Sequence, residues 1–576
     1  MIEENPSIFG RIKKNRGEFP LDRLMSFCAS KVRSHNKQAN IALAILHPSK
    51  AKYVKENYFT KLRSITVATP SFQRLRWGDG FSAIEFIGNS MRKRAAWYSW
   101  RAMRLRKELG FAAKSFAGWL IVLSMIYSPW AMGCVAPWAI DGLVALTILA
   151  GCAWLFGCFA ERRTPRIGKL VLGCVIFLLG QGWWMVLNAH GSYDPISGRI
   201  LRTDSLWNAG PGAVDGPVCG AMMWQITGVL SALLVSCDMA CDQKWRQRFA
   251  WTMALTGSSI ALYGLLQRGG LAPNLTSSES AEGAFASYGY WGDAGSYLNL
   301  IIPWLFVFSL TATSGKSVRT WIARAGLLLA IAGTFVNLSR ATMVIAIAML
   351  LGLGLWAWRR YGKSKSLGDG AMRYQIVGAL ALTSFVVIWA GRDVVWKRWA
   401  QFPGALTPDN PRLLMLKVSV PMARDAGFFG EGPGSFKLLL PTTPYMLPEL
   451  YPRWKVTVYR PDEAVNGYEY VDNDFLQFVI EWGSIGALVW ALLIVGALVK
   501  GIRIWHRLST EHERLLYVAA FSAIAGILAH ALVDAPLQIA SLQLYTAIDI
   551  AILYRFLPQM RYLHNNLSMR DFRTRL

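Results

Sequence analysis

The stretch VDNDFLQFVIEWGSIGAL, residues Val471–Leu488, places three polar side chains directly before a long apolar run. An apolar run of about 20 residues is long enough to cross the core of a bilayer as an α-helix. Within it, Asp474, Gln477 and Glu481 follow at i, i+3 and i+7, so they lie on one face of that helix. A polar face on a membrane span is expected to point toward other helices or a wet cavity. The stretch therefore predicts a membrane helix that begins at a polar site.

Similar apolar stretches recur along the chain from about residue 112. The sequence has 576 residues, is 53% hydrophobic and carries a formal charge of +26. We predict an all-α polytopic membrane protein with about twelve transmembrane helices and one large, partly helical periplasmic loop. The predicted spans are residues 113–132, 136–160, 168–188, 218–237, 249–266, 294–313, 320–338, 341–358, 374–390, 474–499, 515–533 and 535–555.

The charged connections between these spans predict their orientation. With the N-terminus inside, every cytoplasmic connection is basic, whereas the outer connections at about 190–217 and 268–293 carry more acids than bases. Lys and Arg that flank membrane spans are retained on the cytoplasmic side. We therefore expect both termini in the cytoplasm, and membrane lipids rather than nucleic acid explain the positive charge.

Five segments follow from this layout. Residues 1–110 are expected to form a basic cytoplasmic region. Within it, residues 92–110 could be a helix on the membrane surface or an ordinary basic segment that flanks the first span. The remaining segments are spans one to nine in 111–390, the periplasmic loop in 391–473, spans ten to twelve in 474–556 and a basic cytoplasmic tail in 557–576.

The eight cysteines show no metal-type spacing, and most lie inside apolar stretches. Cys134 and Cys219 are both predicted near the outer face. A bridge between them and two unpaired core thiols are both compatible with the sequence.

Two arginines are predicted to face outward. Arg340 follows Ser339 in the turn between spans seven and eight, where a guanidinium must be paired or anchored to lipid phosphate. Arg412 falls in the first turn of a helix that Asn410 and Pro411 are suited to begin, and such an N-terminus favours anions. Arg412 could also simply pair with Asp409.

Further polar motifs lie on the same predicted side. The glycines of GEGPGSF, including Gly432 and Gly434, predict a tight turn and not a dinucleotide site, because no βαβ unit surrounds them. His530 and Asp534 are four residues apart near the end of span eleven, which allows an orienting hydrogen bond. Asp474 could also serve only the dipole of its helix.

The order of these motifs, SR, NPRLLMLK, GEGPGSF, NDFLQFVIEWGSIG and HALVD, resembles the O-antigen ligase and polymerase superfamily of bacterial membrane glycosyltransferases. The resemblance is strongest over residues 292–556. It implies transfer of a glycan from undecaprenyl pyrophosphate to lipid A core or a similar glycolipid or saccharide acceptor, at the periplasmic face of the inner membrane. It also implies that no cofactor or metal is required.

The resemblance assigns Arg340 and Arg412 to the pyrophosphate, whose oxygens a forked guanidinium can bind. Relatives commonly have His-Asn where this chain has Asp472-Asn473, so Asp472 occupies the position of the expected base, with His530 as the alternative. We also expect six further residues to bind substrate or to support the site: Ser339, Gly432, Gly434, Asn473, Asp474 and Asp534.

Several alternatives stay open at this level. Repeat-unit polymerisation, transfer to a protein hydroxyl, a carrier or flippase for lipid-linked glycan, and a scaffold without activity are each compatible with the sequence. Asp472-Asn473-Asp474 also has the Asp-x-Asp form that can hold Mg²⁺ or Mn²⁺.

Overall fold

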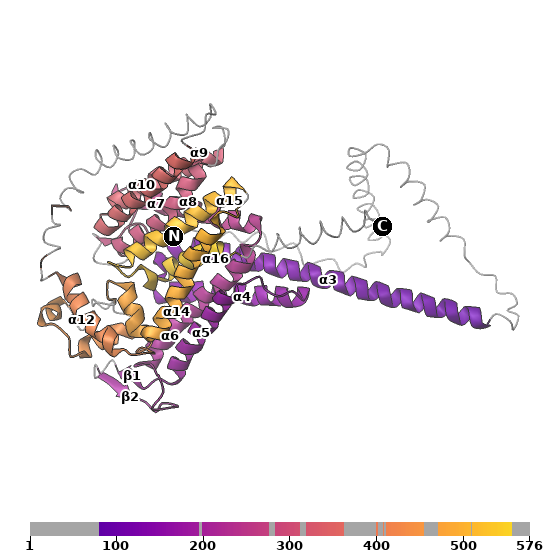
Figure 1. Ribbon diagram of the computed structural model, residues 1–576, viewed down its shortest axis with the longest axis horizontal. Coiled ribbons are helices and arrows are strands. Elements are labelled where there is room, and N and C mark those ends of the chain that lie inside the picture. Colours follow the sequence, from indigo (N-terminus) through magenta and orange to yellow (C-terminus); the bar gives the residue numbers. More distant parts are fainter. Residues whose placement is uncertain are drawn as a thin grey trace, which may run out of the picture. The chain divides into compact units, whose positions relative to one another are not determined.

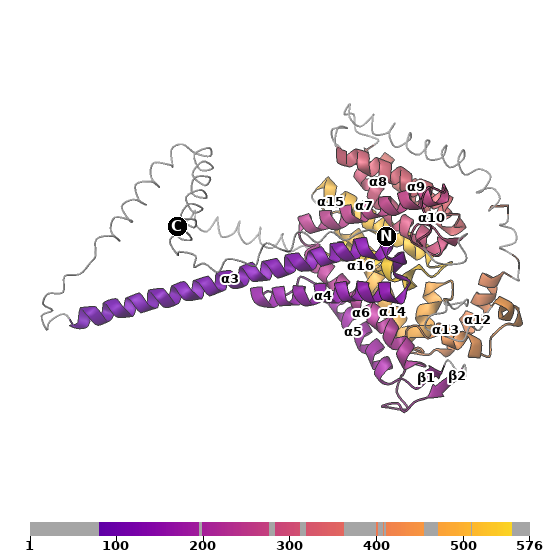
Figure 2. The same cartoon turned by 180° about the vertical axis from the view of Figure 1, so that it is seen from behind.

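The computed structural model describes residues 80–194, 199–275, 283–310, 318–361, 399–400, 407, 410–453, 470–508 and 510–555. These residues are almost entirely helical, as Figures 1 and 2 show from opposite sides. The elements in chain order are α3 (Gly80–Trp130), η1 (Met132–Cys134), α4 (Pro137–Glu161), α5 (Lys169–Leu187), β1 (Gly191–Asp194), β2 (Arg199–Arg202), α6 (Gly216–Met239), α7 (Gln243–Arg268), α8 (Trp291–Leu310), α9 (Val318–Val336), α10 (Arg340–Tyr361), α12 (Pro411–Asp425), α13 (Phe436–Leu439), η4 (Leu440–Thr442), η5 (Pro448–Arg453), α14 (Asp474–Trp505), α15 (Glu511–His530), η6 (Pro536–Gln538) and α16 (Ala540–Tyr554).

The predicted all-α membrane architecture is confirmed. Ten described helices are long and apolar enough to span a membrane, and they coincide with predicted spans one to eight, ten and eleven. The predicted span at 374–390 lies outside the described residues. The twelfth span was predicted to begin at residue 535, but α16 begins only at Ala540, because the turn η6 at Pro536–Gln538 comes first.

Three further features of the structure bear on the predictions or add to them. The basic stretch 92–110 lies within α3, the helix that also contains the first span. Cys134 and Cys219 are buried free thiols, so no bridge joins them. The short antiparallel hairpin β1–β2, with Gly191 opposite Arg202, was not predicted from the sequence.

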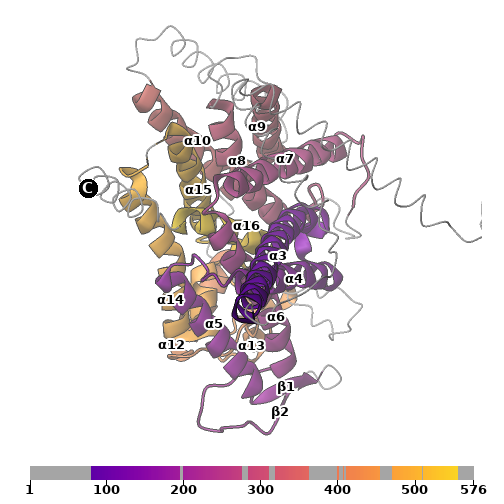
Figure 3. The same cartoon turned by 90° about the vertical axis from the view of Figure 1, so that its right-hand side faces the viewer.

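Helix α8 lies at the centre of the described bundle. It packs against α7, α9, α10, α15 and α16, and most of its side chains are buried. Small residues permit these close contacts: a Cβ on Gly295 would lie 2.3 Å from the Thr342 side chain. Figure 3 shows α8 between α7, α10 and α15. The N-terminus of α8 therefore meets several helices, and the candidate site is at this end.

Ion pairs join several segments at the end of the bundle away from the start of α8. At this end, Glu513 pairs with Arg246 at 3.1 Å and with Arg555 at 2.8 Å, and Asp238 pairs with Arg166 at 3.2 Å. Three of the basic connections predicted to be cytoplasmic supply residues to these pairs. We call the opposite end, where α8 and α14 begin and α15 ends, the polar end.

Candidate active site

The start of α14 is fastened to the turn that follows α15. Asn473 caps α14 by accepting a hydrogen bond from the backbone N–H of Leu476 at 3.0 Å, and its side-chain amide donates to the Leu532 carbonyl at 3.0 Å. Asp474 is fully buried, and its carboxylate accepts hydrogen bonds from Leu537 N at 2.8 Å and from Gln538 Nε2 at 3.1 Å. Asn473 and Asp474 therefore join the start of α14 to the segment that follows α15.

Arg412 lies at the centre of a polar cluster formed by four separate segments. Its Nη2 donates to the Tyr290 hydroxyl at 3.0 Å. Its Nε is 3.6 Å from Asp472 Oδ2, and its Nη2 is 3.6 Å from Asp534 Oδ2. We call Tyr290, Arg412, Asp472 and Asp534 the Arg412 cluster. Asp409, the other partner considered for this arginine, lies outside the described residues.

The geometry of the Arg412 cluster leaves the guanidinium available to a ligand. Charge-assisted N–H···O bonds are usually about 2.7–2.9 Å long, so both contacts to carboxylates are ion pairs and not close hydrogen bonds. The Arg412 side chain is also 44% exposed. An anion with oxygens spaced like those of a phosphate could replace the carboxylates at this side chain.

The electrostatics of the Arg412 cluster suit proton transfer. Burial raises the pKa of Asp472 from its ordinary 3.8 to about 6, with Arg412 lowering it and Asp534 raising it further. Burial alone would lower the pKa of the Arg412 guanidinium, but Tyr290, Asp534 and Asp472 raise it above its ordinary value. Near neutral pH the cluster thus combines a permanent cation with a carboxylate that can accept a proton.

Asp472 also has an unusual backbone conformation. Its φ is +58°, in the left-handed region, which only a few per cent of non-glycine residues adopt. The capped start of α14 follows immediately, and this combination turns the Asp472 side chain toward Arg412 while Asp474 faces the protein interior. Strained conformations of this kind occur often at functional sites.

His530 lies behind the Arg412 cluster. It is only 1% exposed, its Nδ1 hydrogen-bonds the Ser296 hydroxyl, and its Nε2 is 3.6 Å from Asp534 Oδ2. The predicted orienting hydrogen bond between His530 and Asp534 is therefore wrong, because this distance exceeds that of a hydrogen bond. Of the two candidate bases, Asp472 is the more accessible, with 26% of its side chain exposed.

Ser339 and Arg340 lie at the same end of the bundle. The turn from α9 to α10 is tight, as predicted, with Leu338 at φ +65°. Beside it, the Asn337 amide donates to the carbonyl of Trp291, the residue that follows Tyr290. Ser339 is buried and its carbonyl accepts a hydrogen bond from the Thr342 hydroxyl, while Arg340 is half-buried at the first position of α10. Arg340 and Arg412 thus both lie near the start of α8.

The GEGPGSF motif hydrogen-bonds with α14. Gly432 N donates to the Glu481 carbonyl at 2.9 Å, and the backbone of Gly434 hydrogen-bonds the Glu481 side chain. These contacts lie where α14 is interrupted: Gly483 has φ +67° and ψ 179°. Gly432 and Gly434 therefore support α14, about 10 Å along the helix from Asp474.

The two carboxylates of the Asp-x-Asp stretch do not face a common ligand. Asp472 faces Arg412, whereas both oxygens of Asp474 accept hydrogen bonds from the turn at Leu537 and Gln538. In the described parts of the chain, no three His, Cys, Asp or Glu side chains are grouped closely enough to hold a metal ion.

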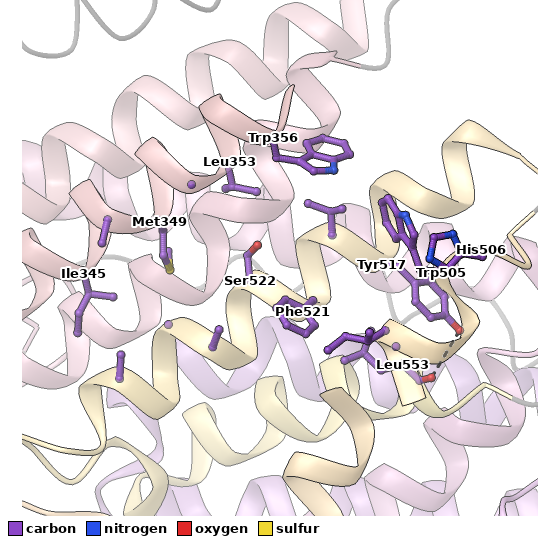
Figure 4. Close-up of a pocket in the computed structure, with 18 residues that line it drawn as sticks. Ile345, Met349, Leu353, Trp356, Trp505, His506, Tyr517, Phe521, Ser522 and Leu553 are labelled. Atoms are coloured by element: carbon purple, nitrogen blue, oxygen red, sulfur yellow. Dashed lines mark hydrogen bonds between the residues drawn. The ribbon is translucent and has the colours of Figure 1, made fainter. Parts of the chain in front are cut away.

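A large apolar cavity is separate from the Arg412 cluster. It has a volume of about 610 Å³ and is lined by α10, α14 with its C-cap His506, α15 and Leu553 of α16. Figure 4 shows Met349, Leu353 and Trp356 from α10 along one side and Phe521 and Tyr517 from α15 along the other. The lining residues include none of the Arg412 cluster.

Tyr290 was missed in the sequence analysis. Its hydroxyl accepts from Arg412 and lies 3.5 Å from Asp534 Oδ2, and burial raises its pKa, so it remains a neutral hydrogen-bonding group. The available signal was the aromatic stretch YGYWG directly before span six. Because tyrosine is also common at ordinary membrane interfaces, this stretch alone does not indicate that Tyr290 contacts Arg412.

The fold is that of a multi-pass membrane protein, and at one end of its helix bundle an arginine lies beside two carboxylates. Residues 325–491 match the family model described as O-Antigen ligase, a range that runs from α9 into α14 and contains Arg340, Arg412 and Asp472. This match supports the resemblance to the O-antigen ligase and polymerase superfamily. In general terms, it also supports the activity of a ligase-like membrane glycosyltransferase. The HALVD motif, Tyr290 and Asp534 lie outside the matched range. No curated protein matches this chain.

Proposed function

We propose that the protein transfers a glycan from undecaprenyl pyrophosphate to a hydroxyl group of a glycolipid or saccharide acceptor, such as lipid A core. The polar end would face the periplasm of a bacterial inner membrane, with both termini in the cytoplasm. The observation that carries this proposal is the placement of Arg412, within the matched range, beside a carboxylate whose pKa is raised to about 6.

In the first step, the diphosphate of the donor would replace the carboxylates at Arg412. Both contacts are 3.6 Å long, so the exchange breaks no close hydrogen bond between Arg412 and a carboxylate. The Tyr290 hydroxyl, which accepts from Nη2 at 3.0 Å, would keep the guanidinium in place. Arg340 would bind the same diphosphate from the start of α10, with Ser339 supporting that turn.

In the second step, Asp472 would act as the general base. It would accept the proton of the acceptor hydroxyl while the hydroxyl oxygen bonds to the anomeric carbon. The bond from that carbon to the pyrophosphate oxygen would break, and the electron pair would leave with the pyrophosphate. Arg412 would stabilise this developing charge, to which one preorganised donor contributes about 3 to 4 kcal/mol. Direct displacement inverts the anomeric configuration.

In this scheme the two guanidiniums supply the positive charge at the leaving group, so we propose that transfer needs no metal. Asn473 and Asp474 would act by fixing the start of α14, so that Asp472 keeps its orientation toward Arg412. Gly432 and Gly434 would stabilise the interrupted part of α14. Asp534 would hold Arg412 in the absence of donor.

The proposal is tested by incubating purified protein with undecaprenyl-pyrophosphate glycan and candidate acceptors in the presence of EDTA. Product should form with the wild type, fall strongly in Arg412→Gln and Asp472→Asn, and persist in Arg424→Gln, which changes an exposed arginine at the other end of α12. Full turnover by Asp472→Asn would assign the base elsewhere, with His530 first. Movement of the glycolipid across vesicles without any product would instead identify a carrier.

A further inference from the structure

A sharp turn in the periplasmic segment reaches the membrane-spanning part of the bundle. The turn comprises Gly427–Gly430, directly after α12, with Gly427 at φ +65° and Gly430 at φ +79°. Both phenylalanines in it are exposed: Phe428 to 70% and Phe429 to 42%. Adjacent exposed apolar side chains form a patch, and an exposed apolar patch can mark contact with a membrane or with another protein.

Helix α5 provides a first measure of depth. Gln181 donates its side-chain amide to the Phe429 carbonyl at 3.1 Å and to the Trp482 carbonyl at 2.8 Å. The 19 residues of α5 extend over about 28 Å, close to the thickness of a hydrocarbon core. Gln181 lies six residues before the helix end at Leu187, which is about 9 Å inside that end.

Helix α14 provides a second, independent measure. Ser484 N donates to the Gly427 carbonyl and Ile485 N to the Phe428 carbonyl, both at 3.1 Å. No charged residue occurs between Gly483 and Lys500, a stretch of about 25 Å as helix. Because a hydrocarbon core is about 30 Å thick, this part of α14 lies inside the core or at its edge. Figures 1 and 3 show α5 beside α14.

The backbone of the turn is suited to an apolar surrounding. Irregular backbone at membrane depth is tolerated only where its polar groups find partners within the protein. Here the carbonyls of three consecutive residues, Gly427–Phe429, accept from Ser484 N, Ile485 N and Gln181 Nε2. The turn can therefore lie among lipid chains without leaving these carbonyls unsatisfied.

We propose that Gly427–Gly430 is a re-entrant turn whose Phe428 and Phe429 side chains lie among the acyl chains of the leaflet at the polar end. The partner is the bilayer itself, because the depth follows from spans that cross it whether or not a substrate is present. Burial of each phenylalanine in the acyl chains removes apolar surface from water and so anchors the turn in the leaflet. The turn would fix the height of α12, and so of Arg412, above the membrane.

The test measures water access to single introduced cysteines in phospholipid nanodiscs without any donor lipid, by the rate of modification with a charged maleimide. Phe428→Cys and Phe429→Cys are compared with Leu492→Cys, on the exposed apolar face of α14, and Lys417→Cys, on the exposed face of α12. The wild type gives the background of its own thiols. Labelling in SDS confirms that each thiol is present.

Both phenylalanine positions should react roughly tenfold or more slowly than Lys417→Cys, like Leu492→Cys, because a thiol in lipid does not ionise. Either position suffices if the other variant fails to fold. Reaction as fast as at Lys417→Cys would overturn the proposal, because the turn would then lie in water. The readout requires no turnover, so the result is independent of the proposed glycan transfer.

Discussion

Replacing Arg412 with Gln should change both the rate and the pH dependence of transfer. The substitution removes the cation that is 3.6 Å from Asp472 and from Asp534 and that hydrogen-bonds Tyr290. Loss of a preorganised donor to developing negative charge costs about 10² to 10³ in kcat. Arg424→Gln, a change of another exposed arginine of α12, is the matched control.

The pH shift has a definite sign. The wild-type base must be deprotonated, so kcat/KM should rise with pH through the Asp472 pKa of about 6. Arg412 lowers that pKa, so its removal should move this limb to higher pH. Two unit charges near 4 Å apart interact by about 4 kcal/mol at an effective dielectric constant of about 20. Because Arg412 is 44% exposed, we discount this to about 1–2 kcal/mol, or about one pH unit.

The assay is kcat/KM for transfer between about pH 5 and pH 9, with wild type, Arg412→Gln and Arg424→Gln at equal donor concentration. An upward shift of the acidic limb in Arg412→Gln alone supports the assignment of Asp472 as base. If kcat/KM of Arg412→Gln falls but the acidic limb of its pH profile does not shift, the titrating group is not in contact with Arg412. An unchanged rate would refute the role of Arg412 itself.

The remaining predictions concern stability. Because the pKa of Asp472 is raised from 3.8 to about 6 in the fold, its charged form destabilises the protein above about pH 6 and not below about pH 4. Asp472→Asn should therefore increase the free energy of unfolding at pH 8 by at most about 3 kcal/mol, and so raise the apparent Tm at pH 8 but not at pH 4. Equal shifts of Tm at both pH values would contradict this. Gly483→Ala should cost several kcal/mol. Its backbone conformation, with φ +67° and ψ 179°, is almost restricted to glycine and accounts for about 1–3 kcal/mol, and its Cβ would lie 2.3 Å from the Phe428 carbonyl oxygen. In a thermal-shift assay, Gly180→Ala, where no atom lies within 4 Å of the added Cβ, should change the apparent Tm little; an equal loss in both variants would refute the argument.

The membrane spans were largely predictable from the sequence, because about 20 apolar residues must form a helix in lipid. Their ends were less predictable where polar turns interrupt the pattern. Residues 535–539 are apolar enough to extend the last span, yet Asp474 accepts hydrogen bonds from Leu537 and Gln538 and holds that segment as a turn. A tertiary contact therefore decides where α16 begins.

The residues of the candidate site were largely predictable from the sequence, but which of them contact one another was not. Helix-capping patterns identified Arg412, and the resemblance to the O-antigen ligase superfamily identified Asp472, but their pairing depends on how α12 packs against α14. Tyr290 could not be distinguished from an interfacial aromatic residue. The interruption at Gly483 was also hidden, because glycine is common inside membrane helices and only its pairing with Gly427–Gly430 reveals the break.

The proposed transfer depends on binding of the lipid carrier's diphosphate by Arg412. The most direct test is the affinity of purified wild type, Arg412→Gln and Arg424→Gln for undecaprenyl pyrophosphate in detergent, without acceptor. Hydrogen bonds to charged groups are worth about 1.5–3 kcal/mol, so Arg412→Gln should bind about 10- to 100-fold more weakly than the other two. Equal affinity in all three proteins would contradict the claim.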